Sequence, residues 1–101
     1  MDSVLVLDID SVIRNDYKIQ LLNMLSSKVR MQDIRQLIAD NSINDYTELY
    51  RMLYDDVDKF SGNQSAACIV AIAEGQYRDI NVVDKEINFM STIMKIQEII
   101  L

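Results

Sequence analysis

Two carboxylates near the start of the chain have the spacing of a catalytic pair. Asp8 follows the apolar run at residues 4–7, and Asp10 lies two residues further on. Side chains two apart point to the same side of a strand, where one carboxylate can act as a nucleophile and the other can transfer protons. The run is too short, however, for its periodicity to separate a strand from the buried end of a helix.

The segment from Val4 to Val12 (VLVLDIDSV) resembles the first motif of haloacid-dehalogenase-type phosphatases. In that family the first aspartate attacks phosphorus and the second acts as acid and base. Such enzymes need a parallel sheet wrapped by helices, with further Ser or Thr, Lys and acidic motifs on later strands. No second strand is evident after Val12, so we reject the phosphatase and expect Asp8 and Asp10 to be solvated.

An acidic run before Gly62 invites comparison with a calcium-binding loop; its aspartates are Asp55, Asp56 and Asp58. That loop needs a glycine at its sixth position and a bidentate glutamate at its twelfth. Counting from Asp56 places Ser61 sixth and Ala67 twelfth. We therefore expect no metal site, and we expect the acidic run to be the solvated face of a helix.

The remaining residue types offer little else for catalysis. Histidine is absent, and two glycines, Gly62 and Gly75, cannot form a phosphate-binding loop. The single Cys68 excludes an internal disulfide or a multi-cysteine zinc site, and its alanine and aliphatic neighbours indicate an inert core thiol. We expect no enzyme activity, catalytic residue, cofactor, metal or small-molecule ligand.

The charge argues against nucleic acid as a direct partner. The chain has 16 acidic and 10 basic residues, with no basic patch that could neutralise several phosphates. Four tyrosines could stack on bases, but three of them recur every fourth residue along one helix and form a packing ridge more simply. These tyrosines are Tyr46, Tyr50 and Tyr54, with Tyr77 further on.

Length and composition predict one all-α domain. The chain has 101 residues, half of them hydrophobic, with two glycines and no proline. It has neither a leader-like start nor a run of about 18 apolar residues that could span a bilayer. We expect a soluble protein of a reducing cytoplasm, with no membrane partner.

Helical periodicity places the elements that would position any site. A first helix is predicted at about residues 16–27 and a short amphipathic one around 31–38. Asn44 or Asp45 can cap a third helix that ends at Gly62. Its apolar stripe comprises Tyr46, Leu49, Leu53, Val57 and Phe60.

The last third of the chain predicts two long apolar helices joined by an elbow at residues 76–79. Asn63 or Ser65 opens the fourth helix, whose many alanines suit the centre of a bundle. Asp84 caps the fifth, which has too many apolar residues for one narrow stripe and should be buried on more than one side. Two helices so apolar in so short a chain need further cover, which points to assembly.

Four segments in order carry a family resemblance: Asp33-Ile-Arg-Gln-Leu-Ile38, Asp45-Tyr-Thr-Glu-Leu-Tyr50, Ala73-Glu-Gly-Gln-Tyr-Arg78 and Lys85-Glu-Ile-Asn-Phe89. They resemble the C-terminal collar domain of clamp-loader small subunits of the replication factor C type, most closely that of large tailed phages. In this family an apolar helix ends near a Tyr-Arg or Tyr-His pair and the last helix begins around a glutamate. Residues 80–83 depart from it, because relatives often have a small residue or glycine there.

The resemblance implies an oligomerisation function in DNA replication. Such domains pack into a collar that holds five subunits together while their ATPase modules open a sliding clamp. It implies other clamp-loader subunits as partners in a homo- or hetero-oligomer, in an infected bacterial cell for a phage protein. It also divides the chain into a lid-like end at 1–15 and a collar domain at 16–101. The ATPase modules are missing, so the chain is either a fragment or a split product acting in trans.

The expected subunit contacts lie around the elbow of the last two helices. The interface residues that follow from the resemblance and the apolar pattern are Tyr77, Arg78, Glu86 and Phe89. Arg78 and Glu86 would fix the register of the packing, or else form a surface ion pair worth under about 1 kcal/mol. The alternative is a free-standing helical adaptor that shares this helical rhythm and binds an unrelated protein.

Overall fold

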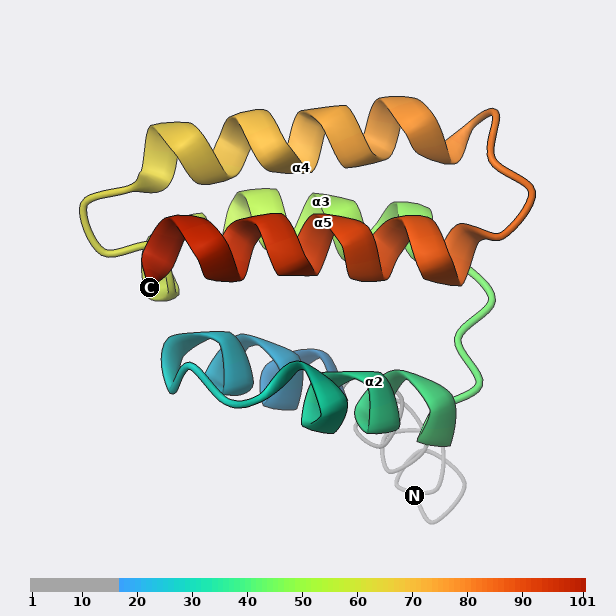
Figure 1. Cartoon of the computed structure of the whole chain (residues 1–101), viewed down its shortest axis with the longest axis horizontal. Coiled ribbons are helices and arrows are strands. Elements are labelled where there is room, and N and C mark those ends of the chain that lie inside the picture. The colour runs from blue at the N-terminus through green and yellow to red at the C-terminus, as the bar shows by residue number, and fades with distance from the viewer. Residues whose placement is uncertain (1–16) are drawn as a thin grey trace, which may run out of the picture.

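The computed structural model describes residues 17–101, and every regular element in that range is a helix (Figure 1). The Asp8 and Asp10 pair and residues 1–15 lie outside the described residues. A helix occupies residues 17–26, and it is followed by α2 (Met31–Asp40), α3 (Tyr46–Asp55), a short 3₁₀ helix (Val57–Lys59), α4 (Ser65–Asp79) and α5 (Lys85–Ile100). The predicted all-α bundle of about five helices is confirmed for this part of the chain.

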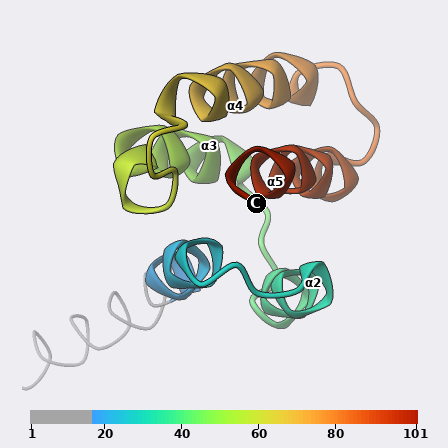
Figure 2. The same ribbon diagram turned by 60° about the vertical axis from the view of Figure 1, so that its left-hand side comes forward.

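The helices form three layers. Figures 1 and 2 show α3 and α5 side by side in the middle, α4 on one side of them, and α2 with the helix at 17–26 on the other. The prediction that α4 is the central helix was therefore wrong. Its small residues allow α3 and α5 to approach on one side only, and Ala66 and Ala73 face outward.

The core is built around an aromatic cluster contributed by α3 and α5. The Phe89 ring is fully buried, with its centroid 5.3 Å from that of Tyr46 and 5.4 Å from that of Tyr50. Aliphatic residues from the outer layers surround this cluster, including Leu21, Leu25, Ile34, Ile38 and Ile72. Burial of such side chains is the main stabilising term of the fold.

The apolar stripe predicted on the third helix is buried throughout, but one continuous helix does not carry it. Helix α3 ends at Asp55, and the 3₁₀ helix follows Asp56. The tighter winding, with the Phe60 amide bonded to the Val57 carbonyl, keeps both side chains in the core. The chain then turns at Gly62, whose φ of 59° is a left-handed conformation suited to glycine.

Side-chain caps begin two of the helices. Asp45 and Asp84 each accept a 3.1 Å hydrogen bond, from the backbone amides of Thr47 and Ile87 respectively. The cap of α5 was predicted, and Asp45 was one of two alternatives for α3. Helix α4 has no side-chain cap, because Ser65 is already helical and its hydroxyl donates to Asp58 at 2.8 Å.

Helix α5 is covered on three sides, as its excess of apolar residues predicted. Phe89 faces α3, Lys95 lies 3.1 Å from Glu74 of α4, and Gln97 donates to the Val29 carbonyl oxygen at 2.9 Å. The fourth side is exposed; its residues are Ile87, Ser91, Met94 and Glu98. We call these four residues the α5 outer strip.

Candidate functional site

A buried polar network joins the three helices that carry the candidate site. The side-chain nitrogen of Asn88, Nδ2, donates to the Tyr50 hydroxyl and to the Gly75 carbonyl oxygen, both at 2.9 Å. The Thr92 hydroxyl donates to the Asn88 carbonyl oxygen at 3.3 Å. Burial raises the pKa of the Tyr50 phenol, so it stays protonated and remains part of the network at neutral pH.

Gly75 lets α4 and α5 meet closely at this network. A Cβ atom at that position would lie 2.1 Å from Thr92 Oγ1 and 2.9 Å from Tyr50 Cε1. The sequence analysis missed this role of Gly75 and Asn88. A glycine in the interior of a helical pattern, and an asparagine between apolar residues, were the signals that could have revealed it.

The prediction of an elbow at residues 76–79 was wrong, because these residues continue α4 and the turn to α5 lies at residues 80–84. A partly buried ion pair joins the two ends of this elbow. Asp79 is 6 % exposed, and its Oδ2 lies 3.1 Å from Lys85 Nζ. The same ammonium group donates to the Asp79 carbonyl oxygen, which stabilises the end of α4. The other carboxylate oxygen of Asp79, Oδ1, is buried without a hydrogen-bond partner among the described residues.

The four predicted interface residues have different surroundings. Tyr77 is 74 % exposed, and Arg78 and Glu86 are exposed as well. Within residues 17–101 neither Arg78 nor Glu86 forms an ion pair; the charged pair that fixes the elbow is Asp79 with Lys85. Phe89 is fully buried against Tyr46 and Tyr50, because it repeats with Ile93 and Ile96 on the inner side of α5, so it cannot contact a neighbouring chain in this structure.

An apolar stripe runs along the outer side of α4. Its members recur at alternating intervals of four and three, the spacing of a helix-packing seam: Ala66, Val70, Ala73, Tyr77 and Ile80. Three of these side chains are more than half exposed, at 57 % for Val70, 74 % for Tyr77 and 76 % for Ile80. We call these five residues the α4 outer stripe.

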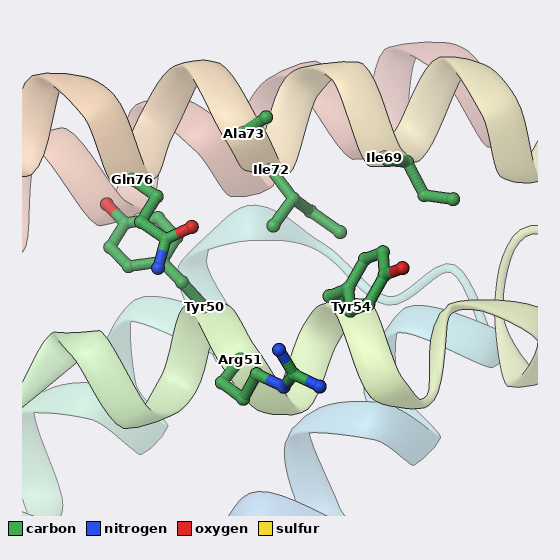
Figure 3. Close-up of a pocket in the computed structure, with 7 residues that line it drawn as sticks. All are labelled: Tyr50, Arg51, Tyr54, Ile69, Ile72, Ala73 and Gln76. Atoms are coloured by element: carbon green, nitrogen blue, oxygen red, sulfur yellow. The ribbon is translucent and has the colours of Figure 1, made fainter.

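A groove of about 300 Å³ between α3 and α4 borders this stripe and shares Ala73 with it (Figure 3). Tyr50, Ile69 and Ile72 make it largely apolar. At its rim the Arg51 guanidinium lies 5.3 Å from the centre of the Tyr54 ring, with its Nε 3.0 Å from an Asp55 oxygen. Ridges at Val70 and Tyr77 beside a hollow at Ala73 form a surface suited to a side chain of another helix.

The groups with reactive side chains are held in structural contacts. Cys68 is fully buried, as predicted, and burial raises the pKa of its thiol. Asp55, Asp56 and Asp58 contact Arg51, Lys59 and Ser65 respectively. Among residues 17–101 there is no group of three or more His, Cys, Asp or Glu side chains that could hold a metal ion. None of the helices in this range is long and apolar enough to cross a membrane.

Comparison with protein-family models, with curated proteins and with solved structures gave no match. The likeness to clamp-loader collar domains therefore rests on the four sequence segments. The local geometry shows an exposed apolar stripe on α4, a partly apolar exposed strip on α5, and an ion pair between Asp79 and Lys85 where the two helices are joined.

Proposed function

We propose that this domain is an oligomerisation module of a sliding-clamp loader, of the collar type, with no catalysis of its own. The α4 outer stripe is the observation that carries the proposal. Monomeric proteins seldom expose a continuous apolar surface of this kind, and such surfaces mark interaction sites. The order of the family-like segments supports other clamp-loader subunits as the partners.

Burial of the stripe would provide the energy of assembly. Each square ångström of apolar surface removed from water contributes about 25 cal/mol before the entropic cost of association is subtracted. Val70, Tyr77 and Ile80 expose most of their area and would supply the centre of such an interface. The large Tyr77 side chain projects from this surface, and the small Ala73 leaves a hollow beside it. A partner helix could pack against both.

A second exposed face, the partly apolar α5 outer strip, would allow contacts between unlike faces of neighbouring subunits. The α5 outer strip exposes Ile87 by 68 % and Met94 by 52 %, together with the polar residues Ser91 and Glu98. A contact between unlike faces repeats from subunit to subunit and can close into a ring. A collar of several subunits needs contacts of this type.

Co-purification with clamp-loader ATPase subunits of a tailed phage, combined with light scattering of the chain alone, tests the proposal. The wild-type chain should bind those subunits, and a Val70→Asp/Tyr77→Asp variant should lose binding at least roughly tenfold, given the apolar area removed. Ile19→Asp is the matched control, because Ile19 is 58 % exposed in the opposite layer. A chain that stays monomeric and never co-purifies would refute the collar function, and stripe-dependent binding of an unrelated helical protein would support the adaptor instead.

A further inference from the structure

The groove between α3 and α4 is an apolar hollow that no described side chain fills. Figure 3 shows its two walls, with Arg51 and Tyr54 on α3 opposite Ile69 and Ile72 on α4. Its volume is about 300 Å³, against roughly 150 Å³ for a protein cavity that takes up benzene, so it has room for two aliphatic side chains. Apolar surface left open in this way marks a site of contact.

The described chain begins beside this groove. The Lys18 ammonium lies 2.7 Å from the Glu48 carboxylate of α3, and Glu48 is three residues before Arg51 on the same face of that helix. One helical turn, about 5 Å, separates Glu48 from the rim of the groove at Arg51. Because an extended chain spans up to about 3.6 Å per residue, the few residues at 14–16 can cover that distance.

The residues that precede this point have the apolar character of an occupant. Residues 4–13 (VLVLDIDSVI) include seven aliphatic side chains within ten positions. Such a segment lowers its free energy when its side chains leave water. A short linker also holds a segment at an effective concentration on the order of millimolar, which favours it over the same segment of another molecule.

The charges at the rim suit this segment as well. The Nε of Arg51 lies 3.0 Å from an Asp55 oxygen, and the five N–H donors of a guanidinium allow it to bind a second carboxylate. The two aspartates of the segment can supply that carboxylate, in a charge-assisted hydrogen bond. Glu48, on the same face, is neutralised by Lys18 and therefore repels the segment little.

We propose that residues 4–13 of this chain dock in the groove between α3 and α4. Ala73 belongs both to the groove and to the α4 outer stripe, so the docked segment competes with any partner helix for this surface. Docking is a property of the chain alone. Its consequence rests on the proposed function: the segment opposes contacts with loader subunits until a partner displaces it.

The test is paramagnetic relaxation enhancement, with a nitroxide label on Ser3→Cys of the full ¹⁵N-labelled chain. Cys68 is fully buried, so the label reacts at residue 3. We expect the strongest broadening at the amides that line the groove, at residues 50–54 and 69–76. A mixture of ¹⁵N chains without the label and labelled ¹⁴N chains should show no such broadening, because the contact lies within one chain.

Two variants of the segment separate apolar docking from mere proximity. Leu5→Asp/Leu7→Asp removes two apolar side chains, and it should reduce the broadening at the groove severalfold. Ser11→Asp/Asn15→Asp is the matched control, since it adds the same two charges and keeps every apolar side chain of the segment. It should retain the broadening. The amide spectrum of the last two helices shows whether each variant is folded.

Arg51→Gln tests the charge at the rim and should weaken the broadening. Arg35→Gln, at an exposed position on α2, should leave it unchanged. Strongest broadening on the α5 outer strip, or broadening that folded Leu5→Asp/Leu7→Asp retains, would overturn the proposal. Broadening in the mixed sample would also overturn it and would identify a second copy as the occupant. If the chain assembles with loader subunits without docking, only this inference fails; if the segment docks but the chain never assembles, the proposed function fails.

Discussion

Asn88 of α5 donates a 2.9 Å hydrogen bond to the carbonyl oxygen of Gly75 in α4, and its second amide hydrogen bonds the Tyr50 hydroxyl of α3. One buried side chain thus joins three helices, including α4, which carries the exposed apolar stripe. The hydrogen bonds are directional, so they fix the rotation of α4 and α5 in a way that apolar packing alone does not. We therefore expect the relative placement of α4 and α5 to depend on this residue.

Asn88→Ala should therefore destabilise the fold by about 2–4 kcal/mol, because it leaves two buried acceptors without their donor and removes packed atoms. Urea unfolding followed by circular dichroism measures the change. Asn23→Ala is the control, since Asn23 is exposed on the helix at residues 17–26 and should shift stability by less than about 0.5 kcal/mol. Equal effects of the two substitutions would show that the network contributes nothing.

Gly75→Ala should destabilise the protein, although alanine is normally favoured over glycine in a helix by about 1 kcal/mol. The new Cβ would lie 2.1 Å from Thr92 Oγ1, so α4 and α5 must separate, at about 1–3 kcal/mol for such overpacking. Thermal unfolding measures the loss of stability. Gly62→Ala cannot serve as the control, because the φ of 59° at Gly62 would strain an alanine there.

The matched test for Gly75 is a double-mutant cycle with Thr92→Ala. Removal of the Thr92 hydroxyl takes away the closest atom, so the double variant should be more stable than the sum of the two single effects by at least about 0.5 kcal/mol. Additive effects would locate the strain elsewhere along the α4 and α5 contact.

The helices could be predicted from the sequence because their signals are local. The cap at Asp84 and the stripe from Tyr46 to Phe60 follow from residue type and spacing over a few positions. The break after Asp55 could not be predicted, since no glycine or proline marks it and the tight turn is held by tertiary packing of Val57 and Phe60.

The candidate site was less predictable, since it depends on which side of each helix the other layers cover. The sequence places Tyr77 and Phe89 in equally apolar helices, yet one is exposed and the other is at the centre of the core. The same limit explains why α4 was expected at the centre of the bundle. The pairing of Asp79 with Lys85 also depends on the path of the elbow, which has no distinctive local sequence signal.

Asp84→Ala should destabilise the fold by about 1 kcal/mol, the usual contribution of a side-chain N-cap. The Asp84 carboxylate accepts from the Ile87 amide at 3.1 Å, and alanine cannot replace that acceptor. Urea unfolding measures the change, and Asp84→Asn should retain most of the stability because its amide oxygen can still accept. Equal losses in both variants would point to the charge and not to the cap.

Tyr46 should make the fold sensitive to alkaline pH. Burial, followed by the nearby Glu86 and Asp84 carboxylates, raises the pKa of Tyr46 from its ordinary value of 10.0 to about 12. Folding thus favours the neutral phenol, and the associated stability is complete below about pH 10 and is lost as the pH rises through 12.

Tyr46→Phe removes this ionisation and keeps the ring that packs on Phe89. The urea midpoint of the variant should fall less than that of wild type between pH 9 and pH 11, whereas Tyr54→Phe, at a half-exposed position, should follow wild type. A Tyr46→Phe variant that loses as much stability as wild type over this interval would show that other groups cause the alkaline unfolding.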